Sequence, residues 1–135
     1  MVKSKLIKLE EYIQELQEYE NIELEEYKNN EMKKRYLERT LQLALESILD
    51  IGNHIISDER LGSPNSNADI IEILTKHEVF EIGKTQKERY INMVKFRNIL
   101  VHDYTDIEDK IVVNILNNQL EDIKAIFNFY YDYLE

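Results

Sequence analysis

The sequence contains no cysteine, so neither a disulfide framework nor a thiolate metal site is available to the chain. A chain without disulfides suits a reducing environment, and we expect a cytoplasmic location. The N-terminal residues mix lysines and a glutamate into their apolar positions, which is the pattern of neither a signal peptide nor a membrane span. The sequence therefore predicts a soluble protein that makes no use of a membrane.

Glycine and proline are also scarce, with three glycines and one proline in 135 residues, and strand-like alternation of apolar and polar residues is absent. This composition predicts an all-α protein. The length is that of one domain with a single sizeable core, and we expect one domain over residues 1–135.

The net charge of −10 argues against a protein that coats nucleic acid without specificity, because such binding depends on neutralising phosphates. The charge is unevenly spread, however. Between Lys84 and His102 five cations stand against the single carboxylate of Glu88. The five are Lys84, Lys87, Arg89, Lys95 and Arg97. Two interpretations remain open: the mouth of a phosphate-handling cleft, or a basic, solvated helix face.

Apolar residues recur at helical spacing in five stretches. They predict helices over residues 2–19, 30–56, 68–77, 85–101 and from 105 to the C-terminus, with residues 21–29 as a connection or a short turn. Ser66 and Asn67 are candidate N-caps of the third helix. The segments Thr85–Glu88 and Thr105–Glu108 match capping boxes, so they predict the starts of the last two helices.

A polar row runs along the long second helix, where Glu46, Asp50 and His54 recur at four-residue steps and so share one face. Carboxylates and a histidine on one face can bind iron or zinc. The Glu-x-x-His pairs that di-metal bundles supply from two helices are absent, though. We favour a hydrogen-bonded structural row at an interface, and the sequence leaves its role open.

The stretch Arg97–Tyr104 carries the candidate chemistry. Arg97 and His102 are five residues apart, so on an ideal helix they lie about 140° apart, whereas Asn98 and His102 share a face. Arg97 and His102 converge if the helix loosens near His102 or if a second copy of the chain completes the site. His102, Asp103 and Tyr104 are predicted at the joint between two helices, where side chains are exposed.

The pattern Arg97-x4-His102-x-Tyr104 resembles the signature of the HepT toxins, which belong to the HEPN superfamily of small helical ribonucleases. The similarity extends over most of the chain, including the long second helix, the loop before Asn67 and the isoleucine-rich final helix. The resemblance implies an antiparallel bundle of about four to five helices. It also implies a two-fold homodimer in which two Arg-His pairs face one cleft.

The implied activity is that of a toxin that cleaves RNA as an endoribonuclease without a metal or a cofactor. A histidine near its ordinary pKa can act as base toward the ribose 2′-hydroxyl or as acid toward the leaving oxygen. His102 and Arg97 are then the catalytic residues, with Arg97 holding the phosphate through its planar fork. Asn98 and Asp103 have supporting positions.

The resemblance further implies a partner, a cognate minimal nucleotidyltransferase antitoxin that silences the toxin by transferring AMP to Tyr104. A phosphate attached there would repel the RNA backbone and occupy Arg97. The alternative is a non-catalytic helical partner, or a substrate-binding subunit, of a nucleotidyltransferase. The acidic balance of the chain mildly favours this alternative. RNA cleavage that is lost on changing His102 separates the two functions.

Overall fold

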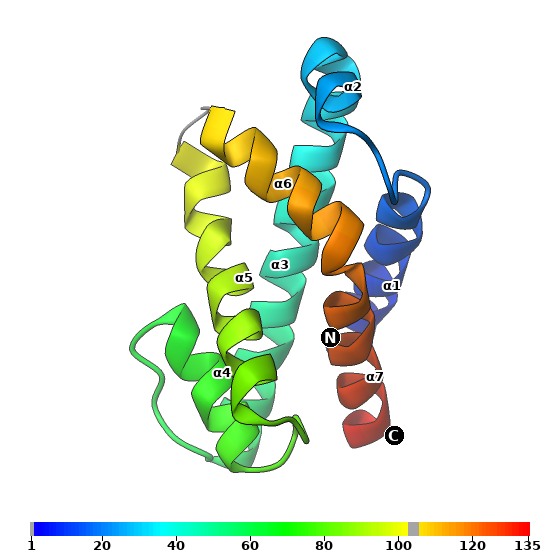
Figure 1. Ribbon diagram of the computed structural model, residues 1–135. Coiled ribbons are helices and arrows are strands. Elements are labelled where there is room, and N and C mark those ends of the chain that lie inside the picture. Colours follow the sequence, from blue (N-terminus) through cyan, green and yellow to red (C-terminus); the bar gives the residue numbers. More distant parts are fainter. Residues whose placement is uncertain (1, 103–105) are drawn as a thin grey trace.

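The computed structural model describes the backbone of residues 2–102 and 106–135, and the side chains of residues 2–98 and 109–135. Over these residues the chain forms seven α-helices and no strand, which confirms the all-α prediction (Figure 1). In chain order the helices are α1 (Val2–Gln17), α2 (Leu24–Asn29), α3 (Glu31–Glu59), α4 (Asn67–Lys76), α5 (Lys84–His102), α6 (Asp106–Asn118) and α7 (Leu120–Leu134). None of the helices in the described part is long and apolar enough to cross a membrane.

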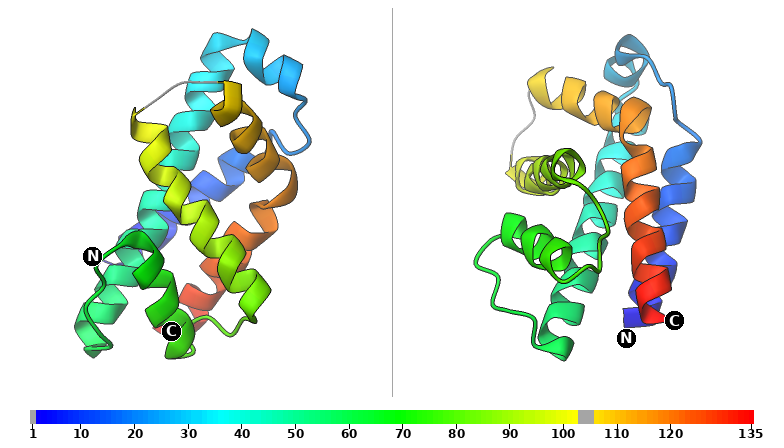
Figure 2. Two further views of the ribbon diagram at one scale, coloured as in Figure 1. Left: turned by 60° about the vertical axis from the view of Figure 1, so that its left-hand side comes forward. Right: turned by 60° about the horizontal axis from the view of Figure 1, so that its bottom comes forward.

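The long helix α3 lies at the centre, and it contacts α1, α2, α4, α5 and α7 (Figures 1 and 2). Its buried residues recur every three or four positions, as the sequence predicts. The apolar residues that recur at this spacing in the sequence are all buried, namely Leu37, Leu41, Ala44, Leu45, Ile48, Ile51 and Ile55. Tyr36 continues the same pattern but is 39% exposed, because its hydroxyl reaches out to donate a hydrogen bond to Glu15 at 2.9 Å.

Helix α4 packs closely against α3 at Gly52. A Cβ placed on Gly52 would lie 2.8 Å from Cγ2 of Ile70, 2.9 Å from Cδ1 of Leu74 and 3.0 Å from the hydroxyl of Tyr130. The same buried tyrosine hydroxyl donates a 2.7 Å hydrogen bond to the carbonyl of Ile48. Helices α3, α4 and α7 therefore meet at a point that only glycine fits.

Ion pairs tie α5 to its neighbours. Lys87 lies 2.7 Å from Glu72 of α4. Arg89 donates from Nε and Nη2 to the two carboxylate oxygens of Asp122 on α7, at 3.2 and 3.0 Å. The apolar face of α5 buries Tyr90, Met93, Val94 and Phe96. Ile91 is partly buried, and the side chains of Ile99 and Leu100 lie outside the described residues.

The helix starts follow the predicted capping in part. Ser66 caps α4 by accepting a hydrogen bond from the backbone of Asp69 at 3.1 Å, as predicted. The start predicted for α5 is one residue late, since the helix begins at Lys84, and the Gln86 side chain accepts from the Gly83 N–H at 3.3 Å. Gln86 supplies the returning half of a capping box, two positions before Glu88, the residue expected to do so. Thr105 lies outside the described residues.

Two predicted connections also differ. Residues 21–29, expected as a connection or short turn, contain the helix α2. The predicted final helix is two helices, with a break at Gln119. Near the break Asn117 donates to the carbonyl of Ile22 at 3.0 Å, and Asn118 donates to Asn114 at 2.7 Å. The Asn117 bond ties the end of α6 to the segment before α2, and α7 begins in a new direction (Figure 2).

Helix α6 is held to α3 by an ion pair in a nearly buried position. Nζ of Lys34 lies 3.0 Å from Oδ1 of Asp109, and Asp109 is 3% exposed. Burial lowers the pKa of Lys34, but the hydrogen bond and the charge of Asp109 outweigh it, and the net effect is a raised pKa.

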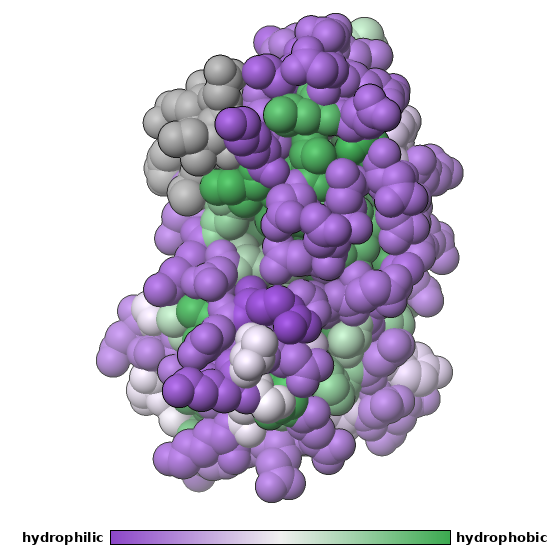
Figure 3. Space-filling model, viewed as in Figure 1, coloured by the Kyte–Doolittle hydropathy of each residue, from purple (hydrophilic) through white to green (hydrophobic). Residues whose placement is uncertain are grey.

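The face of the molecule shown in Figure 3 is mostly hydrophilic, with small apolar areas between polar side chains.

Candidate functional site

Arg97 lies in the C-terminal part of α5 and is fixed by a residue 51 positions earlier in the chain. Its Nη2 donates to Oε1 of Glu46 on α3 at 2.9 Å. The two side chains are 35% and 27% exposed, so the pair is only partly screened by solvent. Glu46 thus holds the guanidinium at the junction of α3 and α5.

The remaining donors of Arg97 are poorly satisfied. Nη1 points to Oδ1 of the exposed neighbour Asn98 at 3.4 Å, which is a long hydrogen bond. Nε is buried and has no hydrogen-bond partner among the described residues. A buried donor without a partner costs free energy. The Arg97 side chain is 35% exposed, so an anion can reach the rest of the guanidinium, and a phosphate matches its planar fork.

The other motif residues are placed only in part. Helix α5 stays α-helical through His102, so the backbone does not loosen between Arg97 and His102. A loosened helix was one of the two ways in which Arg97 and His102 were expected to converge, and the backbone of a single chain does not show it. The His102 side chain, and all of Asp103 and Tyr104, lie outside the described residues.

The polar row on α3 consists mainly of ion pairs to other helices. Glu46 pairs with Arg97 of α5, and Asp50 lies 3.4 Å from Nζ of Lys5 on α1. His54 is exposed. Within the described part of the chain no group of three histidine, cysteine or acidic residues is arranged to hold a metal ion. The row agrees with the hydrogen-bonded interpretation, here at contacts between helices of one chain.

The basic segment of α5 is less basic in three dimensions than in the sequence. Three of its five cations pair with carboxylates from three different helices: Lys87 with Glu72, Arg89 with Asp122, and Arg97 with Glu46. Much of the local excess of positive charge is therefore neutralised. Sequence reasoning missed these partners because the acidic residues are 15 to 51 positions away from their cations.

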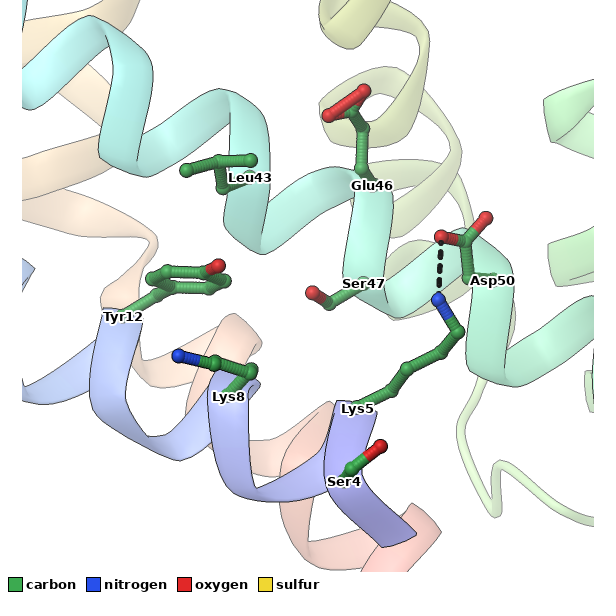
Figure 4. Close-up of a pocket in the computed structure, with 8 residues that line it drawn as sticks. All are labelled: Ser4, Lys5, Lys8, Tyr12, Leu43, Glu46, Ser47 and Asp50. Carbon is green, nitrogen blue, oxygen red and sulfur yellow. Dashed lines mark hydrogen bonds and ion pairs between the residues drawn. The ribbon is translucent and has the colours of Figure 1, made fainter. Parts of the chain in front are cut away.

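A pocket of about 330 Å³ opens between α1 and α3 next to this site. Its lining is polar for the most part, and Figure 4 shows the Lys5 ammonium reaching the Asp50 carboxylate across it. The lining residues are Ser4, Lys5, Lys8, Tyr12, Leu43, Glu46, Ser47 and Asp50. The carboxylate of Glu46, which holds Arg97, points away from the two lysines in this view. One residue of α3 therefore belongs both to the pocket wall and to the arginine site.

Comparison with known proteins identifies relatives over most of the chain. The model of the family described as "HepT-like: Ribonuclease HepT-like" matches residues 9–128. An mRNA nuclease HepT of Shewanella oneidensis is 34% identical over 88 residues, which are 65% of this chain and 65% of that protein. A tRNA nuclease HepT of Aphanizomenon flos-aquae is 28% identical over 110 residues, which are 80% of this chain and 72% of that protein.

Solved structures are similar over nearly the full length. A chain in a crystal structure of a toxin–antitoxin with AMP-PNP superposes with a TM-score of 0.84 at 26% identity, over 97% of both chains. A structure of the tri-AMPylated Shewanella oneidensis HEPN toxin in complex with MNT antitoxin gives a TM-score of 0.82 at 26% identity, over 97% of this chain and 96% of that one.

Proposed function

We propose, because this chain belongs to the HepT-like ribonuclease family, that it is the toxin of a toxin–antitoxin pair and cleaves RNA in the cytoplasm. The observation that carries the proposal is the half-buried guanidinium of Arg97. Glu46 holds it on one side, while its buried Nε has no hydrogen-bond partner among the side chains and backbone that the structure describes. The relatives from Shewanella and Aphanizomenon are named as nucleases of mRNA and of tRNA, which supports RNA as the substrate class.

The proposed chemistry uses the ribose 2′-hydroxyl as nucleophile. One histidine takes its proton, a second protonates the leaving 5′-oxygen, and the products carry a 2′,3′-cyclic phosphate and a 5′-hydroxyl. Arg97 stabilises the charge that develops on the phosphorane. Asn98 and Asp103 orient the neighbouring groups. These steps need neither a metal nor a cofactor, and they make DNA a non-substrate because it lacks the hydroxyl.

Two histidines require two chains. One chain supplies one His102. Arg97 and His102 are five positions apart, so on a regular helix they differ by about 140° in direction. An isologous homodimer supplies both motifs from one gene and sets them about a two-fold axis. Mixing His102→Ala chains with wild type should then lower activity by more than the diluted wild-type fraction explains. A fully active monomer in light scattering would refute the two-histidine mechanism.

The test of the function is an RNA cleavage assay with a metal chelator present. His102→Ala should lose about a hundredfold or more in rate, the usual scale of acid–base catalysis. Arg97→Lys should also be severely impaired, because lysine keeps the charge but lacks the bidentate fork. His54→Ala, which removes an exposed histidine from α3, is the matched control and should remain active. A strict magnesium requirement with 5′-phosphate products would contradict the mechanism.

We also propose that a nucleotidyltransferase antitoxin silences the protein by transferring AMP to Tyr104. The similarity to an AMPylated HEPN toxin in complex with MNT antitoxin supports this partner. A phosphodiester within a Debye length of Arg97, roughly 8 Å at physiological salt, would compete for its fork and repel RNA.

Intact mass after incubation with the partner enzyme and ATP tests the modification. Tyr104→Phe should stay unmodified and active, whereas Tyr131→Phe, which changes an exposed tyrosine of α7, should still be silenced. Modification mapped to another residue would refute the assignment. Modification of a wild-type chain that never cleaves RNA would favour the non-catalytic alternative.

A further inference from the structure

We propose that the pocket between α1 and α3 binds the RNA phosphate next to the one held by Arg97, with Lys5 and Lys8 as its cations. The proposal rests on the proposed ribonuclease function and extends it to a binding subsite. Two features support it, namely the chemistry of the pocket lining and the spacing of the ion pairs along α3.

The lining offers the groups that a single-stranded nucleotide needs. Lys5 and Lys8 supply positive charge, and Ser47 supplies a hydroxyl that lies between the two helices (Figure 4). Tyr12 adds a half-buried aromatic ring on which a base can stack. A pocket of about 330 Å³ is large enough for parts of a nucleotide to enter without a change of backbone.

Both lysines are held only weakly in the free protein. Lys5 lies 3.4 Å from Asp50, with side chains 43% and 54% exposed. Lys8 lies 3.6 Å from Glu11, with side chains 63% and 53% exposed. Exposed pairs of this kind contribute little to stability. A phosphate, which carries more acceptor oxygens, can therefore take the place of either carboxylate at small cost.

The ion pairs along α3 place this pocket beside the Arg97 site. Glu46 and Asp50 are one turn apart on α3, with about 6 Å expected between their Cβ atoms. Each carboxylate holds a cation from another helix, Arg97 of α5 and Lys5 of α1. The pocket wall therefore includes the residue that holds Arg97, and we place the proposed subsite next to the phosphate at the arginine.

The overall charge explains why such a site is useful. A chain with a net charge of −10 repels RNA at a distance, so binding must come from local cations that meet phosphates directly. In the free protein Asp50 holds Lys5 in place. In the proposed complex a phosphate takes over this contact, while Glu46 continues to hold Arg97.

The first experiment measures binding of a single-stranded 2′-O-methyl RNA oligonucleotide, which cannot be cleaved by the proposed mechanism. The Lys5→Gln/Lys8→Gln double variant should bind about tenfold more weakly at moderate salt, with kcat on unmodified RNA changed less than about twofold. The slope of log affinity against log salt should fall by about 0.7, since the subsite neutralises one phosphate and each single-strand phosphate contact contributes about 0.7. Lys3→Gln removes the same charge from α1 outside the pocket and should bind like wild type.

The second experiment changes binding in the opposite direction. Asp50→Asn removes the carboxylate that competes with the phosphate for Lys5, so affinity should rise a few-fold. A merely structural role of the Lys5–Asp50 pair predicts no such gain. The fold of each variant is checked by circular dichroism and thermal melting, and exposed pairs of this kind leave both nearly unchanged.

The outcomes separate this proposal from the proposed function. If wild type cleaves RNA but the double variant binds like Lys3→Gln, the subsite is refuted and the ribonuclease function stands. If binding depends on both lysines but wild type cleaves no RNA, the subsite stands and the function is refuted. If the double variant changes the oligomeric state, the pocket is an interface between copies of this chain and the subsite is refuted.

Discussion

The ion pair between Glu46 and Arg97 should matter more for turnover than for stability. Glu46→Ala removes a 2.9 Å charge-assisted hydrogen bond between side chains that are 27% and 35% exposed. That burial is intermediate between exposed pairs, which are worth up to about 1 kcal/mol, and buried pairs, which cost about 3–5 kcal/mol to break. We expect Glu46→Ala to lower the free energy of unfolding by about 1 kcal/mol, which corresponds to about 4 °C in the melting temperature of a chain of this size.

The effect on cleavage should be larger because Arg97 then loses its main anchor. Nη1 keeps only the 3.4 Å contact to Asn98, so the guanidinium becomes free to leave the phosphate position. We expect kcat to fall about tenfold, since misplaced clamping groups lose much of their effect on the rate. Glu46→Gln keeps an acceptor oxygen but removes a negative charge, so kcat should stay near wild type while KM falls.

Steady-state cleavage of an RNA oligonucleotide, measured well below each melting temperature, tests this expectation. Asp58→Ala is the matched control, because it removes an exposed carboxylate from the same helix away from Arg97. An unchanged kcat for Glu46→Ala would refute the positioning role of Glu46. Equal losses for the alanine and glutamine variants would refute the separation of anchoring from charge.

Two further predictions concern the core. Gly52→Ala should destabilise the protein by about 1–3 kcal/mol despite the better helix propensity of alanine, because the new methyl group would approach Ile70 and Leu74 to within 3 Å. Chemical denaturation measures this loss. The control is Asn53→Ala at the exposed neighbouring position, which should be neutral or slightly stabilising. Burial, followed by the charge of Asp122, raises the pKa of Tyr90 to about 12. This folded-state pKa lies above the unfolded value. The contribution of the neutral hydroxyl to the free energy of unfolding is therefore fully present below about pH 10. It is lost as the pH rises from 10 to 12, by about 2–3 kcal/mol in total. Tyr90→Phe should therefore flatten the decline in unfolding free energy across that interval, and an unchanged pH dependence would contradict the assignment.

Much of the fold follows from local patterns in the sequence. The apolar stripe of α3 predicts its buried face residue by residue, because a central helix shows its period directly. The break between α6 and α7 does not follow from the same pattern. Leu116 and Leu120 keep a four-residue apolar step across it, although two asparagines stand between them. The low helix propensity of the two asparagines was outweighed by the long apolar runs on both sides, so the sequence predicted one continuous helix.

The candidate site was predictable only in part, for a different reason. The motif identifies Arg97 from the sequence, but its partner Glu46 lies on another helix, and no local period relates the two. The polar row drew attention to Glu46 and Asp50 without indicating what they bind. Pairing across helices depends on how α1, α3 and α5 pack, and that packing is set by the whole core.

The central position of α3 has a consequence for genetics. It holds α5 through Glu46 and α6 through Lys34, the two helices between which the motif ends. In a selection for host cells that survive expression of this chain without the proposed antitoxin, mutations should therefore appear on α3 as well as in the motif. Substitutions at Glu46 or Lys34 should reduce the toxicity without abolishing it. Second-site revertants of the Lys34 substitutions should map to its partner Asp109. Arg97, the partner of Glu46, should yield no revertants because the chemistry needs it.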